Sequence, residues 1–132
     1  GHAMADVLFG DVAPRGRLPL TLPKVENEVQ FTKAQYPGEN GVVQYSEKLE
    51  VGYRWYHSHK VRPHYPFGHG LSYTRFEYGP LRMARMKCEV TVRNVGARTG
   101  TEVVQLYVTY PEAAGEPPRQ LKGFDTVLLS PG

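Results

Sequence analysis

The sequence has a single cysteine, Cys88, among its 132 residues. One thiol cannot form a disulfide within the chain, so an oxidising compartment is neither required nor excluded. No stretch reaches the roughly 18 to 20 apolar residues of a membrane-spanning helix, and the chain does not open with the apolar core of a secretion signal. The sequence therefore predicts no membrane partner. If the whole protein is exported to the periplasm or the extracellular space, we expect its signal upstream.

The sequence also has no large excess of charge of one sign. Sixteen lysines and arginines are scattered among thirteen aspartates and glutamates, which gives a formal net charge of +3 without a long basic run. A surface that follows nucleic-acid phosphates needs clustered positive charge. Nucleic acid is therefore not among the predicted partners.

The composition is that of a β-rich globular protein. Hydrophobic residues make up 40% and charged residues 22% of the chain, which excludes strong disorder and predicts a buried core. Glycine (14), proline (11) and tyrosine (9) are frequent, which favours short strands joined by turns over long helices.

The first part of the chain indicates a helix end followed by a long irregular connection. Apolar residues from Ala3 to Phe9 have helical spacing and stop at Gly10, a common helix terminator. So short a helix is not stable alone, so we expect it to belong to a longer one. The stretch from Val12 to Tyr65 is rich in proline, glycine and polar residues, and we expect it to pack across a neighbouring domain.

Beyond Tyr73 the pattern changes to the period of two that half-buried strands require. Cys88 alternates with polar neighbours and is expected on the inward face as a small core residue. Together these features predict the start of an antiparallel β-sandwich that is incomplete at its C-terminal end. The expected strands lie at residues 75–78, 88–93, 104–109 and 122–129.

Several blocks of the chain resemble the C-terminal part of family 3 glycoside hydrolases of the β-glucosidase and β-xylosidase kind. They occur in the family's order and span nearly the whole chain, although Lys48 and His57 depart from the usual residues. The matching blocks are ADVLFGD (5–11), GRLP (16–19), VGYRWY (51–56), PFGHGLSYT (66–74), VRN (92–94), EVVQLYV (102–108), LKGF (121–124) and LSPG (129–132).

The resemblance implies a mainly β fold with three parts. Residues 1–24 would be the tail of an α/β sandwich domain, residues 25–72 a connecting segment, and residues 73–132 the N-terminal part of a fibronectin type III-like sandwich. It also implies that the nucleophilic aspartate and the acid/base glutamate of the family lie upstream, in the barrel and the α/β sandwich domain. No residue here is then expected to be catalytic, and no cofactor is expected.

Local alternatives for chemistry are weaker than this interpretation. Glu47, Glu50 and Asp11 could in principle supply an acid/base pair, but we favour hydrogen bonding that fixes the connecting loop. Four histidines crowd a proline-rich stretch, and two imidazoles would share one side of a strand at His57-Ser58-His59. No cysteine or closely spaced carboxylate completes a tetrahedral set, so no metal site is predicted and loop histidines in solvent are expected.

The aromatic side chains of the connecting segment allow two interpretations. Trp55 and Tyr56 are candidates for stacking on sugar rings. Packing against other domains is favoured, because glycines alternate with the rings and permit close approach. The residues assigned to domain packing are Tyr53, Arg54, Trp55, Phe67 and Tyr73.

The predicted function is that of a non-catalytic structural region of a β-glucosidase-like hydrolase, whose whole chain would hydrolyse terminal β-D-glycosides, glucosides or xylosides, with retention. Its partners would be the upstream barrel and α/β sandwich domains. A stand-alone carbohydrate-binding or adhesion module and a degenerate, inactive homologue remain as alternatives. Because a truncated sandwich has an unpaired edge, we expect the isolated chain to form oligomers or exchange strands.

Overall fold

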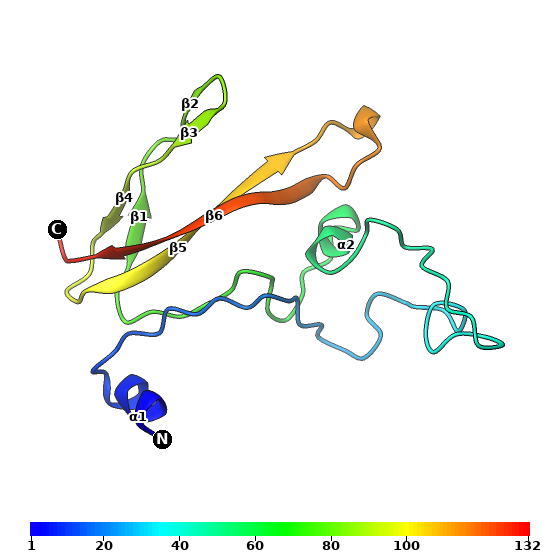
Figure 1. Ribbon diagram of the computed structural model, residues 1–132, viewed down its shortest axis with the longest axis horizontal. Helices are drawn as coiled ribbons and strands as arrows, with labels where there is room; N and C mark the ends of the chain where they lie inside the picture. Colours follow the sequence, from blue (N-terminus) through cyan, green and yellow to red (C-terminus); the bar gives the residue numbers. More distant parts are fainter. The chain divides into compact units, whose positions relative to one another are not determined.

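The computed structural model describes all 132 residues and is mainly β (Figure 1). This confirms the predicted fold class. Neither helix has the length and apolar character that a membrane crossing requires. The elements are α1 (His2–Phe9), α2 (Tyr53–Ser58), β1 (Phe76–Tyr78), β2 (Arg82–Ala84), β3 (Lys87–Glu89), β4 (Val92–Asn94), β5 (Gly100–Thr109), the 3-10 helix η1 (Glu112–Ala114) and β6 (Arg119–Leu129).

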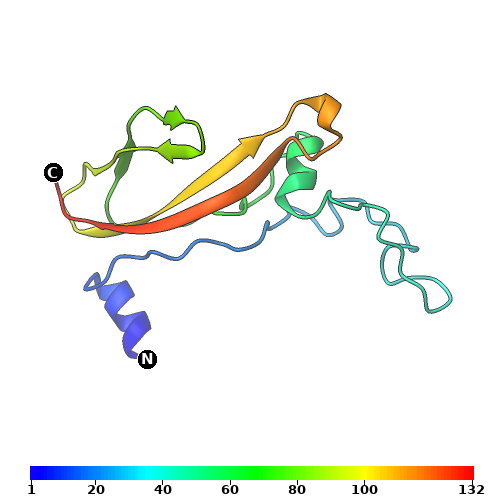
Figure 2. The same ribbon diagram turned by 45° about the horizontal axis from the view of Figure 1, so that its top comes forward.

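The strands form three two-stranded sheets. β1 pairs antiparallel with β4, β2 pairs antiparallel with β3, and β5 pairs with β6. The register sets Phe76 opposite Asn94 in the first pair and Met83 opposite Cys88 in the second. β5 and β6 make a long hairpin with η1 in its connection (Figures 1 and 2).

The chain divides into two compact units. The first comprises Gly1–Arg17, Gly70–Val104 and Phe124–Gly132, and the second comprises Leu18–His69 and Gln105–Gly123. The first unit thus brings the N-terminal segment together with β1 to β4. The second contains the connecting segment with α2 and the tip of the β5–β6 hairpin.

Helix α1 ends as the sequence predicts. Gly10 has φ +86°, in the left-handed region that glycine tolerates, and its N–H donates to the Val7 carbonyl at 3.2 Å. No residue of the helix is buried, and the apolar side chains of Met4, Leu8 and Phe9 are exposed. The helix therefore contributes no core to this chain, and its membership of a longer helix stays a prediction.

Burial is sparse throughout. The buried apolar side chains are those of Tyr56 and Pro117, and the residues Asn94, Thr101 and Gln120 are buried polar ones. The strands are held largely by backbone pairing and by a few polar side chains, with apolar surface left uncovered.

The helix α2 corrects the sequence interpretation of its segment. The stretch from Val12 to Tyr65 was expected to be an irregular connection with its histidines in a loop, but Tyr53–Ser58 within it is helical. The reason is tertiary. The Tyr53 hydroxyl accepts from the Leu121 N–H at 2.9 Å, and the Tyr56 hydroxyl donates to Glu28 Oε2 at 2.8 Å. Contacts with residues distant in the sequence therefore stabilise α2, although its own sequence does not favour a helix.

The expected burial of Cys88 in a core is also wrong. Cys88 is exposed and lines a groove together with apolar side chains that include Val92 and Val104. The strand expected over residues 88–93 is split, because β3 pairs with β2 and β4 pairs with β1. The change of partner between Glu89 and Val92 interrupts the alternation on which the prediction rested.

Candidate functional site

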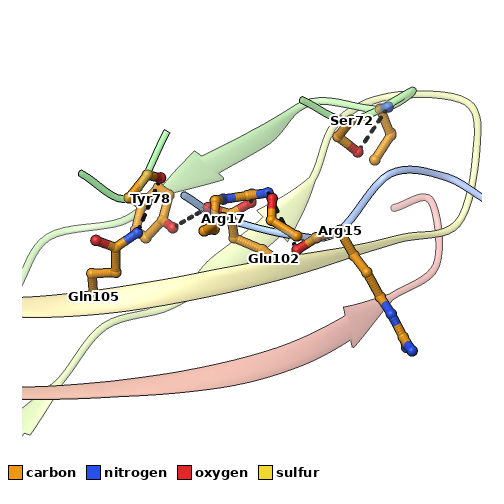
Figure 3. A network of polar contacts seen from close by, with 9 residues as sticks. Arg15, Arg17, Ser72, Tyr78, Glu102 and Gln105 are labelled. Carbon is orange, nitrogen blue, oxygen red and sulfur yellow. Dashed lines mark hydrogen bonds and ion pairs between the residues drawn. The ribbon is translucent and has the colours of Figure 1, made fainter. Parts of the chain in front are cut away.

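The best-defined polar site lies in the first unit, where three side chains from distant parts of the chain meet. Arg17 Nη2 and Glu102 Oε2 are 2.6 Å apart, and the Tyr78 hydroxyl donates to Glu102 Oε1 at 2.8 Å. Figure 3 shows the Arg17 guanidinium beside the Glu102 carboxylate, with the Tyr78 ring nearby. Both oxygens of the carboxylate thus have a partner. We call Arg17, Tyr78 and Glu102 the clasp.

The ion pair of the clasp is largely withdrawn from solvent, whereas Tyr78 is half exposed. The Arg17 and Glu102 side chains are 13% and 14% exposed. Glu102 lies on β5 at the same side of the strand as Val104, since residues two apart share a face. A carboxylate in that position needs a cation and hydrogen bonds to offset its loss of hydration. Arg17 and Tyr78 supply both.

Close approach of two backbones allows Arg17 to reach this position. A Cβ added at Gly70 would collide with the Gly16 carbonyl oxygen and with the Arg17 side chain. Only glycine at position 70 lets the N-terminal segment lie this near. The clasp therefore depends on a glycine from the PFGHG block as well as on its three polar side chains.

The clasp alters the chemistry of Tyr78. Desolvation, followed by the hydrogen bond to Glu102 and its negative charge, raises the pKa of Tyr78 to about 12, although the positive charge of Arg17 acts in the opposite direction. The neutral phenol is the form that donates to the carboxylate. Its contribution to stability is thus fully present below the ordinary pKa of 10.0 and is lost as the pH rises through about 12.

This gives a testable pH dependence. In an alkaline titration of phenolate absorbance, Tyr78→Phe is expected to remove one of the phenols that ionise near pH 12, because the pKa of Tyr78 is raised to about 12. Tyr56, whose pKa is also raised to about 12 by burial and by Glu28, stays as the internal reference. If the variant instead lost a phenol that ionises near the ordinary value, Tyr78 would not donate to Glu102.

The second unit contains an aromatic cluster built around Tyr53. Its ring centroid lies 4.8 Å from that of Phe67 and 6.0 Å from that of Tyr107, the latter edge to face. The Arg119 guanidinium carbon lies 4.1 Å from the Tyr107 ring centroid. Two of the residues assigned to domain packing, Tyr53 and Phe67, therefore pack with each other and with β5.

The other candidate aromatic and basic residues have separate surroundings. The Arg54 guanidinium carbon lies 5.9 Å from the Tyr53 ring, and the Trp55 ring stacks on His59 at 4.3 Å. Tyr56 is 6% exposed and bonded to Glu28, so it presents no free face for a sugar. In the first unit, the Tyr73 hydroxyl donates to the Val7 carbonyl at 2.6 Å.

A cavity of about 460 Å³ opens beside α2 in the second unit. Trp55 and His59 line it together with Glu47 and Glu50. Glu47 accepts from Gln35 Nε2 at 3.0 Å, and Glu50 lies 3.8 Å from His59 Nδ1. No group of three or more histidine, cysteine, aspartate or glutamate side chains is arranged to hold a metal ion.

Sequence reasoning did not single out the clasp. Arg17 and Glu102 were noted only as members of family-like blocks, and their 85-residue separation gives no local signal. One signal was present. Glu102 falls on the same side of its strand as Val104 and Leu106, and a charge on an apolar face predicts a buried partner.

A model of the glycosyl hydrolase family 3 C-terminal domain matches residues 1–73, and a model of the fibronectin type III-like domain matches residues 102–132. The second match confirms the fibronectin-like sandwich expected for the end of the chain. The division expected at residues 24 and 72 stays a prediction.

Relatives match along the full length of the chain. It is 43% identical to a β-glucosidase of Rhizobium radiobacter over 143 aligned residues, covering 100% of this chain and 18% of that enzyme. It is also 43% identical to thermostable β-glucosidase B of Acetivibrio thermocellus over 142 aligned residues, with coverage of 100% and 18%. The chain thus spans about a fifth of the length of these relatives.

Solved structures agree with these relatives. β-Glucosidase 3B from Thermotoga neapolitana in complex with glucose superposes with a TM-score of 0.91 at 38% identity, over 100% of this chain and 20% of that one. DesR, a β-glucosidase from Streptomyces venezuelae in complex with D-glucose, gives 0.89 at 40% identity, over 98% and 18%. On these matches, the chain belongs to glycoside hydrolase family 3, of which it contains C-terminal-domain and fibronectin type III-like sequence.

Proposed function

We propose that this chain is the non-catalytic structural part of a β-glucosidase, which fastens the fibronectin-like sandwich to the C-terminal domain. The clasp carries this proposal. Arg17 lies within the stretch that matches the family 3 C-terminal domain, whereas Glu102 is the first residue of the stretch that matches the fibronectin-like domain. A largely buried ion pair between the two stretches is the kind of contact that a scaffold requires.

Three of the thirteen acidic side chains have polar partners that support the non-catalytic role. Glu102 is engaged by Arg17 and Tyr78, Glu28 by Tyr56, and Glu47 by Gln35. A retaining glycosidase needs two carboxyl groups about 5 to 5.5 Å apart and free to act on the sugar. We propose that this pair lies upstream, that the whole protein hydrolyses terminal β-D-glucosides or xylosides with retention, and that the upstream domains are the partners of this region.

The intact polypeptide and the 132-residue chain should therefore differ in activity. On chromogenic β-glucoside and β-xyloside substrates, the intact polypeptide is expected to release the chromophore, and the isolated chain to release none above the uncatalysed rate. NMR of the first-formed sugar should show the β-anomer. An inactive intact polypeptide would support the degenerate-homologue alternative, and an active isolated chain would contradict the non-catalytic role.

Two measurements on the isolated chain distinguish the proposed structural role from the alternative of a stand-alone carbohydrate-binding module. Titration with cello-oligosaccharides should show no binding, because Tyr56 is buried and Tyr53 packs against Phe67. Sedimentation at high concentration should show self-association, because Phe9, Phe124 and Leu128 expose apolar surface. A monomer that binds oligosaccharide would favour the stand-alone module instead.

A further inference from the structure

The carbonyl groups at the C-terminal end of α1 need hydrogen-bond donors from outside the helix. The last carbonyls of any helix lack intrahelical partners and need other donors. In α1 the Gly10 and Val12 N–H groups donate to the carbonyls of Val7 and Asp6 at 3.2 and 3.0 Å. The helix has eight residues, no buried residue and no side-chain N-cap, so it depends on contacts from elsewhere.

Two side chains from far along the chain reach this helix end. The Tyr73 hydroxyl donates to the Val7 carbonyl at 2.6 Å across 66 positions. Arg98 Nη1 donates to the Gly10 carbonyl at 3.1 Å across 88 positions. Val7 thereby accepts two hydrogen bonds, and the guanidinium places positive charge where the helix dipole is negative.

The Arg98 backbone is fixed by a buried side chain. Arg98 lies in the turn between β4 and β5, and Asn94, which is 1% exposed, donates from Nδ2 to the Arg98 carbonyl at 2.7 Å. Asn94 Oδ1 accepts from the Gly96 N–H at 3.1 Å in the same turn. The turn is therefore held to the buried end of β4 and presents Arg98 from a defined position.

We infer that Tyr73 and Arg98 form a receptor for the carbonyl end of α1, by which the segment before β1 and the β4–β5 turn fix the position of this helix. This inference deepens the proposed scaffold role and rests on it. The clasp holds the segment after the helix, and the receptor holds the helix end itself. Both side chains are positioning residues that act on the orientation of α1.

Hydrogen exchange of the α1 amides in the intact polypeptide tests the receptor. Arg98→Met is expected to speed exchange in the last turn of α1 about tenfold, since a charge-assisted hydrogen bond and the dipole interaction are both lost. Tyr73→Phe removes only the hydroxyl and is expected to give a smaller increase, about fivefold. The double variant should exceed either single one.

Matched controls make the result specific. Arg85→Met removes the same charge from the turn between β2 and β3, which lies away from α1 in both views (Figures 1 and 2), and should leave α1 unchanged. Arg98→Lys keeps the charge and should restore part of the protection. Amides of β4 and β5 report whether the unit stays folded in each variant.

If the exchange rates of the α1 amides were unchanged in both Arg98→Met and Tyr73→Phe while β4 and β5 stayed protected, the inferred role of these two side chains at the end of α1 would be wrong. Hydrogen exchange needs no substrate, so this outcome is distinct from failure of the proposed hydrolase function. If the intact polypeptide were inactive but its α1 amides still exchanged faster in Arg98→Met, the inferred contact at the end of α1 would be supported and the proposed hydrolase activity would be contradicted.

Discussion

Asn94→Ala is expected to lower the free energy of unfolding of the first unit by about 3 kcal/mol, because each buried group left unpaired costs about 1 to 3 kcal/mol. Its side chain accepts from the Thr74 hydroxyl at 2.6 Å and donates to the carbonyls of Arg98 and Leu129 at 2.7 and 2.9 Å. Alanine removes these bonds together, and water that enters the space recovers only part of the loss.

The size of this effect follows from where Asn94 lies. It is the last residue of β4, yet it joins β4 to the β4–β5 turn, to the segment before β1 and to the end of β6. A single amide thus connects four parts of the unit. Its loss should loosen all of them rather than one strand.

Urea-dependent hydrogen exchange of the β1, β4 and β5 amides in the intact polypeptide measures the loss locally. Thr74→Val is the matched control, because it removes one of the bonds to Asn94 with little change of shape and is expected to cost about 1 kcal/mol. If Asn94→Ala cost no more than Thr74→Val, the amide would not be the common link between these parts.

Elements with a local signal were predictable. The alternation of apolar and polar residues located β5 and β6, and Gly10 marked the end of α1, since both signals depend only on neighbouring residues. The family-like blocks indicated the fibronectin-like sandwich and membership of glycoside hydrolase family 3. The strand and helix-end signals lie within a few residues along the chain, whereas the family resemblance rests on the order of blocks along nearly all of it.

Elements fixed by distant partners were not predictable. Helix α2 forms because Tyr53 and Tyr56 meet Leu121 and Glu28, which no local pattern encodes. The same limit applies to Cys88. The alternating pattern around it correctly indicated a strand, but β3, which contains Cys88, pairs with β2, whereas β4, which begins at Val92, pairs with β1.

The clasp shows which parts of a tertiary contact can be predicted from one sequence. Glu102 on an apolar face predicts that a partner exists, but sixteen lysines and arginines could supply the charge. Choosing Arg17 requires the approach of its backbone to Gly70. The type of interaction was therefore open to prediction, and the identity of the partner was not.

Arg17→Met is expected to lower the free energy of unfolding of the first unit by about 2 kcal/mol, below the 3 to 5 kcal/mol of fully buried pairs because some solvent reaches both side chains. The methionine keeps most of the apolar stem but leaves the Glu102 carboxylate with Tyr78 as its one remaining partner. The cost arises from the unpaired charge and not from lost packing.

A double-mutant cycle separates these two causes. Glu102→Gln alone leaves Arg17 without its counter-charge, whereas the Arg17→Met/Glu102→Gln double variant has no unpaired charge and should be more stable than the sum of the single effects by about 1 to 2 kcal/mol. Hydrogen exchange of the β1 and β5 amides gives all the values. Additive single effects would mean that Arg17 and Glu102 act independently and that the clasp does not fasten the C-terminal domain to the sandwich.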